Sequence, residues 1–229
     1  MKLSFIYSLL LSILFNFSFG QTKFEIKNGS KIYDAEIIVE NCSNDKCDGN
    51  GTVKLISKES KKVIQTFTSE DLYFYFDKDQ KPTVNIIQLY DEQSPLIFDD
   101  FNFDGTEDLA IRNGNNSSYG GPSYDVYVSN SSKTKFFFSN ELTKLAVENL
   151  GMFETDNERK RIITYSKSGC CWHKKAEYIV VPKKGLKLVY SIEEDATGGE
   201  FVKVTTKELI NSKWITKIKK YKLKEYYKD

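Results

Sequence analysis

The segment DDFNFDGTEDLAI, residues 99–111, places oxygen-bearing side chains at alternate positions of a short stretch of chain. Calcium takes six to eight oxygen ligands, and a tight loop supplies them when alternate residues turn inward and a glycine permits a sharp bend. Gly105 stands where the bend falls, and the backbone carbonyl of Thr106 is the expected fifth donor. The sequence therefore predicts a calcium site in residues 100–108, the acidic loop, with these ligands: Asp100, Asn102, Asp104, Thr106 and Asp108.

The acidic loop departs from a helix-loop-helix calcium sensor at one position. Such a loop ends in a bidentate glutamate at its twelfth residue, and here that residue is Ile111, inside an apparent strand. The pattern is instead strand-loop-strand, in which calcium serves as a structural staple. Three carboxylates around a divalent ion leave a local charge of about −1, so that metal binding should order the loop. The alternative is a metal-free polar turn, because Asp, Asn and Gly are also common in ordinary turns.

The elements that must position this loop read as β-strands. Short segments in which apolar and polar residues alternate recur along the chain, rich in aromatic and β-branched residues. The expected strands are 31–40, 51–57, 72–77, 84–90, 95–99, 108–114, 124–129, 135–139, 161–166, 176–181, 186–192 and 201–206. Only residues 139–151 show a helical pattern with a capping residue and a terminal glycine. The lysine-rich tail, from residue 211 onward, is expected to be a solvated edge strand rather than a membrane-binding patch.

These patterns predict a mainly β fold of short antiparallel strands with one or two short helices. Many short strands separated by hairpin-length turns are typical of a compact propeller-like domain, with a β-sandwich as the alternative. Residues 21–229 are expected to form a single β-rich domain.

The first 20 residues predict the location of the protein. MKLSFIYSLLLSILFNFSFG has one lysine, an uncharged apolar run and small residues before Gln21, as in a secretory signal peptide. A retained membrane anchor is the alternative, although we expect no stable anchor after cleavage. Cleavage removes one lysine and no acid, which leaves 32 basic and 32 acidic side chains. Nucleic acid is therefore not an expected partner, because phosphate binding needs a basic face. The expected location is periplasmic or secreted.

Secretion places the four cysteines in an oxidising compartment, where disulfides are the default. Cys42 and Cys47 flank a turn-like SNDK and would form a small hairpin staple. Cys170 and Cys171 would then form a vicinal bridge or remain thiols; two cross-links between the halves of the chain are the alternative.

The sequence offers little for catalysis. His173 is the single histidine, which excludes His-rich zinc sites, and a cysteine nucleophile beside it is disfavoured by secretion. The acidic run 193–195 lacks the surrounding pattern of a glycoside hydrolase and is better explained as a solvated turn. We therefore expect that the protein is not an enzyme.

A polar stretch, NGNNSSYGGPSY, follows the acidic loop and is here named the tyrosine loop, residues 113–124. Small polar residues and rigid aromatic rings suit a loop that enters a binding cleft, because such rings bring contact area at a low entropic cost. The predicted partner-binding residues are Ser117, Ser118, Tyr119 and Tyr124. Tyr124 also fits a core position, because it starts an alternating strand, so Tyr119 is the better candidate for an exposed anchor.

The acidic loop resembles the calcium loops of FG-GAP and VCBS repeats, which occur in extracellular β-propellers. Further stretches, YGGPSYDVYV, LTKLAVENLGMF, IITYSKSGCCWH and ENCSNDKCDGNGTVKL, resemble bacterial calcium-binding inhibitors of peptidoglycan hydrolases, a group that includes periplasmic immunity proteins. The resemblance runs with gaps from about residue 40 to 190. It implies a propeller-like domain, one structural Ca²⁺ and an exposed loop that blocks the active-site cleft of a lysozyme-like peptidoglycan hydrolase. The alternative function is a carbohydrate- or cell-surface-binding adhesive module.

Overall fold

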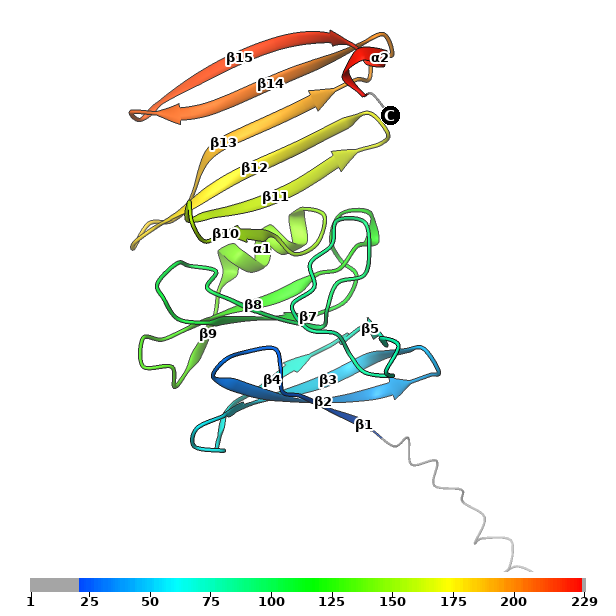
Figure 1. The fold of residues 1–229 in the computed structure, drawn as a ribbon, viewed down its shortest axis with the longest axis vertical. Coiled ribbons are helices and arrows are strands. Elements are labelled where there is room, and N and C mark those ends of the chain that lie inside the picture. The colour runs from blue at the N-terminus through cyan, green and yellow to red at the C-terminus, as the bar shows by residue number, and fades with distance from the viewer. Residues whose placement is uncertain (1–20, 228–229) are drawn as a thin grey trace, which may run out of the picture.

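The computed structural model describes residues 21–227, which form three antiparallel sheets that follow one another along the long axis of the molecule (Figure 1). Strands account for 53% of the structure and two helices are short, which confirms the predicted mainly β class. The stack forms no closed barrel among these residues and is sandwich-like, as in the second of the two predicted arrangements. The predicted signal peptide, residues 1–20, lies outside the described residues. No helix within residues 21–227 is long and apolar enough to cross a membrane.

The first sheet has the strand order β1-β2-β3-β4, with β5 paired to β3. Alternate residues of its long strands, such as Ile37 and Val39 of β2, are fully buried against the next sheet. The strand bounds are β1 (Thr22–Ile26), β2 (Tyr33–Cys42), β3 (Lys46–Ser57), β4 (Val63–Ser69) and β5 (Phe74–Tyr75).

The central sheet, with the order β6-β7-β8-β9, is buried on both faces. Successive residues of a strand point to opposite faces, so Leu109 and Ile111 of β7 pack against the first sheet, whereas Ala110 packs on the other side. The three middle residues of β7, 109–111, are therefore all apolar, between a charged residue at each end. The bounds are β6 (Leu96–Asp99), β7 (Asp108–Arg112), β8 (Tyr124–Ser129) and β9 (Phe136–Phe138).

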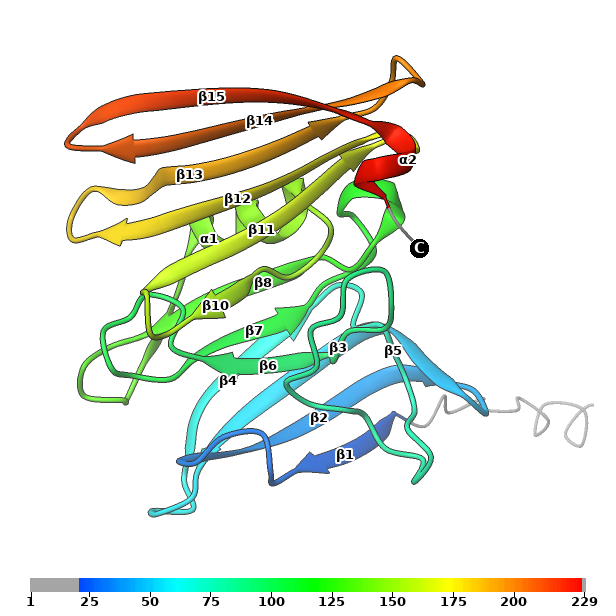
Figure 2. The ribbon, with the colours of Figure 1, turned by 45° about the horizontal axis from the view of Figure 1, so that its top comes forward.

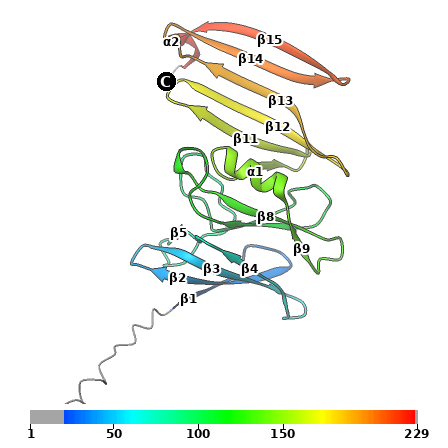
Figure 3. The same ribbon diagram turned by 180° about the vertical axis from the view of Figure 1, so that it is seen from behind.

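Helix α1 (Asn140–Glu148) fills the space between the central and third sheets (Figure 3). The Ser139 side chain caps its first turn by accepting from the Leu142 amide at 3.5 Å. Leu142 and Leu145 belong to the same core as Val126 of β8 and Ile162 of β11. The helix predicted for residues 139–151 is thus confirmed, two to three residues shorter at its C-terminal end.

The third sheet runs in sequence order from β10 to β15. All ten residues of β15 are exposed, and β14 and β15 lie farthest from the other sheets (Figures 1 and 2). The predicted solvated edge strand is confirmed. The bounds are β10 (Glu154–Asp156), β11 (Arg161–Ser168), β12 (Trp172–Val181), β13 (Gly185–Asp195), β14 (Phe201–Ile210), β15 (Lys213–Lys222) and α2 (Leu223–Tyr226).

One predicted strand, residues 84–90, is wrong. Apart from a single bridge between Val84 and Leu96, this segment pairs with no strand of the described structure. Asn85 and Tyr90 have φ angles of 61° and 68°, in the left-handed region, where an extended strand cannot continue. The Asn85 side chain instead donates to the Gly29 carbonyl and accepts from the Phe98 amide. The segment is therefore a structured loop.

Candidate partner-binding site

The acidic loop, between β6 and β7, is closed by its own hydrogen bonds. The Asp100 carboxylate accepts from the amides of Asp104 at 3.0 Å and Gly105 at 2.8 Å. The Asn102 side chain accepts from the Asp104 amide at 2.9 Å, and the Asp104 side chain accepts from the Thr106 amide at 2.8 Å. Gly105 has a φ of +87°, which the bend requires and glycine tolerates. The predicted alternation is thus a run of side-chain-to-backbone turns.

Asp108 ends this loop inside the core. Its side chain is fully buried and accepts from two backbone amides, Phe101 at 3.0 Å and Ser129 at 2.8 Å. Burial raises the pKa of Asp108 to about 7, and the nearby negative charges of Asp104 and Asp100 also raise it. The two hydrogen bonds from backbone amides lower the pKa and offset part of this rise. Asp108 thereby connects the acidic loop to the end of β8.

The donor chemistry of the acidic loop suits calcium, because carboxylate, amide and carbonyl oxygens are the ligands that this ion takes. A cation would also relieve the repulsion that helps raise the Asp108 pKa. Within residues 21–227, however, no three His, Cys, Asp or Glu side chains are grouped closely enough to hold a metal ion. Hydrogen bonds hold the loop in this arrangement, and calcium binding by its residues stays a prediction.

The tyrosine loop leaves the other end of β7 and is tied to remote parts of the chain by Asn113. The Asn113 side-chain oxygen accepts from the Glu70 and Asp71 amides at 3.1 and 3.3 Å, in the connection after β4. Its amide group donates to the Asp125 carboxylate of β8 at 2.9 Å. One asparagine therefore joins the first sheet to the start of the loop.

Arg112, the last residue of β7, donates hydrogen bonds to the first residues of the same loop. It is only 2% exposed; its Nε donates to the Gly114 carbonyl at 3.0 Å, and its Nη2 donates to the Asn115 side chain. The guanidinium lies 5.5 Å from the ring centre of Tyr73 and 5.9 Å from that of Tyr124. Its Nη1 has no hydrogen-bond partner in the described part of the chain. A buried cation thus holds the first turn of the tyrosine loop.

The structure separates the four predicted partner-binding residues. Tyr119 is 63% exposed, and Ser118 is half-buried, with its amide and hydroxyl donating to the carbonyls at the end of α1. Ser117 is buried, and Tyr124 is fully buried, with its hydroxyl donating to the Ser94 carbonyl at 2.8 Å. The prediction that Ser117 and Tyr124 contact a partner is therefore corrected. Tyr124 begins β8 and points to the core that α1 covers.

Tyr119 stands at the tip of the loop, within a short 3-10 turn, η1 (Ser118–Gly120). Its φ of 60° is unusual for a residue other than glycine. Its hydroxyl accepts from the Gly169 amide at 2.5 Å, in the turn between β11 and β12. The third sheet therefore holds this exposed ring in place.

A cleft of about 370 Å³ opens beside Tyr119. It lies between the loop that precedes β6 and the tyrosine loop, with Arg112 and Lys167 also on its walls. The loop after β7 and the C-terminal end of β11 lie on the same side of the molecule, on the right in Figures 1 and 2. The cleft thus combines segments that are distant in the sequence.

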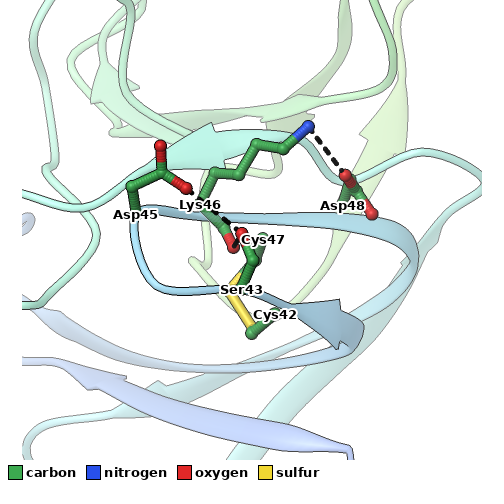
Figure 4. Close-up of a disulfide and its surroundings, with 6 residues drawn as sticks. All are labelled: Cys42, Ser43, Asp45, Lys46, Cys47 and Asp48. Carbon is green, nitrogen blue, oxygen red and sulfur yellow. Dashed lines mark hydrogen bonds and ion pairs between the residues drawn. A yellow bond between two sulfur atoms is a disulfide. The ribbon is translucent and has the colours of Figure 1, made fainter.

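Two disulfides are present. Cys42 bonds to Cys47, where β2 and β3 meet, with Cα atoms 4.1 Å apart (Figure 4). Cys170 bonds to its neighbour Cys171 in the β11–β12 turn. The predicted Cys42–Cys47 pairing is confirmed; of the states left open for Cys170 and Cys171 the structure shows the vicinal bridge, and cross-links between the halves of the chain are excluded. The bonds are compatible with a periplasmic or secreted location, because disulfides persist in oxidising compartments.

Three residues that line the cleft are not among the predicted site residues: Arg112, Tyr90 and Lys167. The sequence contains a usable signal for Arg112, since it is a charge that directly follows the apolar residues 109–111 of β7. Tyr90 lies in a segment for which the sequence predicts a strand. Lys167 lies in the SKSGCCWH stretch, in which the recognisable chemistry is that of the cysteines and the histidine. Nothing local indicates that these two side chains meet.

No family model matches the sequence, and no curated protein matches it. A solved structure described as that of a Xanthomonas type IV secretion system related protein is similar to this chain, with a TM-score of 0.66 and 22% sequence identity. The match covers 87% of this chain and 94% of the other. At this identity the likeness shows that the two chains share a fold.

Proposed function

We propose that this protein is a secreted, non-enzymatic inhibitor that binds a lysozyme-like peptidoglycan hydrolase. The observation that carries the proposal is the setting of Tyr119: an exposed ring beside a cleft, on a loop tied to three other parts of the fold. A ring fixed before binding loses little entropy when a partner covers it. The sequence resemblance to hydrolase inhibitors and the fold shared with a protein related to a secretion system support a role at the bacterial envelope.

Inhibition would work by exclusion. The tip of the tyrosine loop, Ser118 to Pro122, would enter the sugar-binding groove of the hydrolase, and the Tyr119 ring would cover the surface on which a sugar packs. Substrate and inhibitor would then compete for one groove. We therefore expect competitive inhibition, which raises the apparent KM for peptidoglycan and leaves kcat unchanged.

The test is inhibition of a lysozyme-type hydrolase by the mature protein and its Tyr119→Ala variant. We expect the inhibition constant to rise at least about 30-fold, because a central aromatic anchor contributes about 2 kcal/mol or more. Phe137→Ala is the matched control, since this ring is 49% exposed on β9 and does not line the cleft. Equal inhibition constants for wild type and Tyr119→Ala would remove the tyrosine loop from the proposal.

We also propose that Ca²⁺ binds the acidic loop and stabilises the scaffold. Thermal unfolding and inhibition would be measured in calcium and in excess chelator, with terbium luminescence as a direct readout of binding. At a calcium concentration 100 times Kd, binding would stabilise the fold by about 2.7 kcal/mol. Asp104→Asn should abolish terbium binding, whereas Asp79→Asn, in another exposed turn, should not. Full thermal stability in chelator would contradict the calcium part.

A second candidate function is a carbohydrate- or cell-surface-binding adhesive module. It is favoured by two exposed rings, Tyr90 and Tyr119, on the walls of one cleft, because aromatic faces stack on sugars. Pull-down with insoluble peptidoglycan, run beside pull-down with purified hydrolases, separates the two functions. Retention on peptidoglycan alone would favour the module.

A further inference from the structure

Lys167, near the end of β11, places a positive charge between two exposed tyrosine rings at the cleft. Its Nζ lies 4.5 Å from the ring centre of Tyr90 and 4.8 Å from that of Tyr119. The negative faces of aromatic rings attract such a cation. All three residues line the cleft, so the ammonium is held at a defined position there.

The Lys167 ammonium has no anionic partner among the described residues. Other lysines pair with carboxylates, as Lys23 and Lys54 do with Glu36, but within residues 21–227 no carboxylate lies within 4.0 Å of the Lys167 ammonium. Asp91 and Glu92 line the same cleft without forming an ion pair with it. The three N–H donors of the lysine are therefore available to an incoming anion.

A second cation lines the same cleft. Arg112 is buried, and its Nη1 has no hydrogen-bond partner among residues 21–227. Burial raises the pKa of the Glu92 carboxyl and the Arg112 charge acts against this, so the Arg112 guanidinium is partly balanced by Glu92 as well as by ring faces and neutral oxygens. A carboxylate that docks on Lys167 would also gain from this nearby positive charge. Asp91 and Glu92 on the same walls offset part of this gain, so the acceptor of an incoming acidic group is Lys167, which forms no ion pair within residues 21–227.

The backbone of both rings supports a binding role. Tyr90 and Tyr119 have φ angles of 68° and 60°, a left-handed conformation that is unfavourable for a residue other than glycine. The Gly169 amide, which donates to Tyr119, lies two residues after Lys167. The same turn therefore orients the ring and the lysine together.

We infer that Lys167, held between Tyr90 and Tyr119, is the charged centre of the contact surface and binds a carboxylate in the catalytic cleft of the hydrolase. The inference rests on the proposed function and adds the chemistry of recognition. Most glycoside hydrolases cut with a pair of carboxylates flanking the scissile bond. A fixed ammonium that enters such a cleft relieves the repulsion between them and excludes the substrate.

The test is a double-mutant cycle with full-length mature protein. Lys167→Met is titrated against an inhibited lysozyme-type hydrolase and against the same hydrolase with its catalytic glutamate changed to glutamine. Lys217→Met on β15 is the matched control, because it removes the same charge far from the cleft. Lys167→Arg keeps the charge, and thermal unfolding confirms that each variant is folded.

We expect Lys167→Met to weaken binding to the unmodified hydrolase at least about 30-fold, because removal of one member of a covered charge pair is costly. Against the glutamine variant the loss should shrink to less than about threefold. Wild-type affinity should also fall as salt rises.

Several outcomes would overturn the inference. Equal affinities of Lys167→Met and Lys217→Met would show that the lysine is not at the contact. An equal loss against both hydrolases would show that its anion is not the catalytic carboxylate. If the wild type binds the hydrolase but Lys167→Met causes no selective loss of affinity, the proposed inhibitor function stands and only the role of Lys167 is removed. Failure of the wild type to bind any lysozyme-type hydrolase removes both.

Discussion

The two loops at the ends of β7 are stabilised in opposite ways. The acidic loop, which precedes the strand, is closed mainly by bonds among its own residues, from Asp100 to Thr106, and only its end is tied to distant elements, where Glu107 accepts from Ser30 and Asp108 accepts from the Ser129 amide. The tyrosine loop, which follows the strand, is held by distant elements: the connection after β4, the end of α1 and the β11–β12 turn. A loop closed by hydrogen bonds between near neighbours takes most of its shape from its own sequence. A loop tied to three elements takes its shape from the assembled fold, and this is what fixes Tyr119 beside the cleft.

The largest effect should come from Asp108, the fully buried carboxylate of the acidic loop. Asp108→Ala leaves the buried amides of Phe101 and Ser129 unpaired, at about 1–3 kcal/mol each, while relief of a buried charge offsets part of this. We expect the free energy of unfolding to fall by about 2–4 kcal/mol in urea titrations with chelator present. Asp104→Ala, whose partners are more accessible, should change it by less than about 1 kcal/mol. If the two variants unfold alike, the loop is not anchored through Asp108.

Arg112→Met should affect the other loop. The substitution keeps a long side chain but removes the donors to Gly114 and Asn115, which costs about 1–3 kcal/mol. Hydrogen exchange at residues 113–121 should speed up, and the inhibition constant should rise, while terbium binding at the acidic loop is unchanged. A parallel loss of terbium binding would show that β7 couples the two loops.

Tyr119→Phe isolates one tie of the tyrosine loop. The ring stays, but the Gly169 amide loses its acceptor, which is worth about 0.5–1.5 kcal/mol. The inhibition constant should rise about 2–10-fold, well below the effect of Tyr119→Ala. A loss as large as that of the alanine variant would mean that the hydroxyl itself contacts the partner.

The smallest effect concerns Asp125, the partner of Asn113. Burial raises the pKa of Asp125, and the Asn113 hydrogen bond acts against this. As pH rises from the ordinary aspartate pKa of about 3.9 to the raised folded value, the unfolded chain loses its proton first, so stability should decrease across that window. Asp125→Asn should remove this contribution to the slope of urea midpoint against pH. An unchanged slope would show that Asp125 does not titrate in this way.

Much of the scaffold was predictable because it depends on local patterns. Period-2 alternation identified β2, the central strands and most of the third sheet, and the capping serine and spaced leucines identified α1. Cys42 and Cys47 were predicted to pair because only a short turn separates them. The failure at residues 84–90 has a physical cause. Alternation reports which side chains are buried, but it does not report the positive φ angles that break a strand at Asn85 and Tyr90.

The candidate site also has parts that local sequence patterns predict and parts that depend on the tertiary structure. By itself the sequence determined the acidic loop, whose oxygen donors and bend lie within nine residues, and it indicated Tyr119 as an exposed anchor. Only the tertiary structure decided that Tyr124 and Ser117 are buried and that Lys167 stands between Tyr90 and Tyr119. Hydrogen bonds between near neighbours follow from spacing along the chain. A cleft lined by residues 90, 112, 119 and 167 depends on how the sheets pack, which no local pattern records.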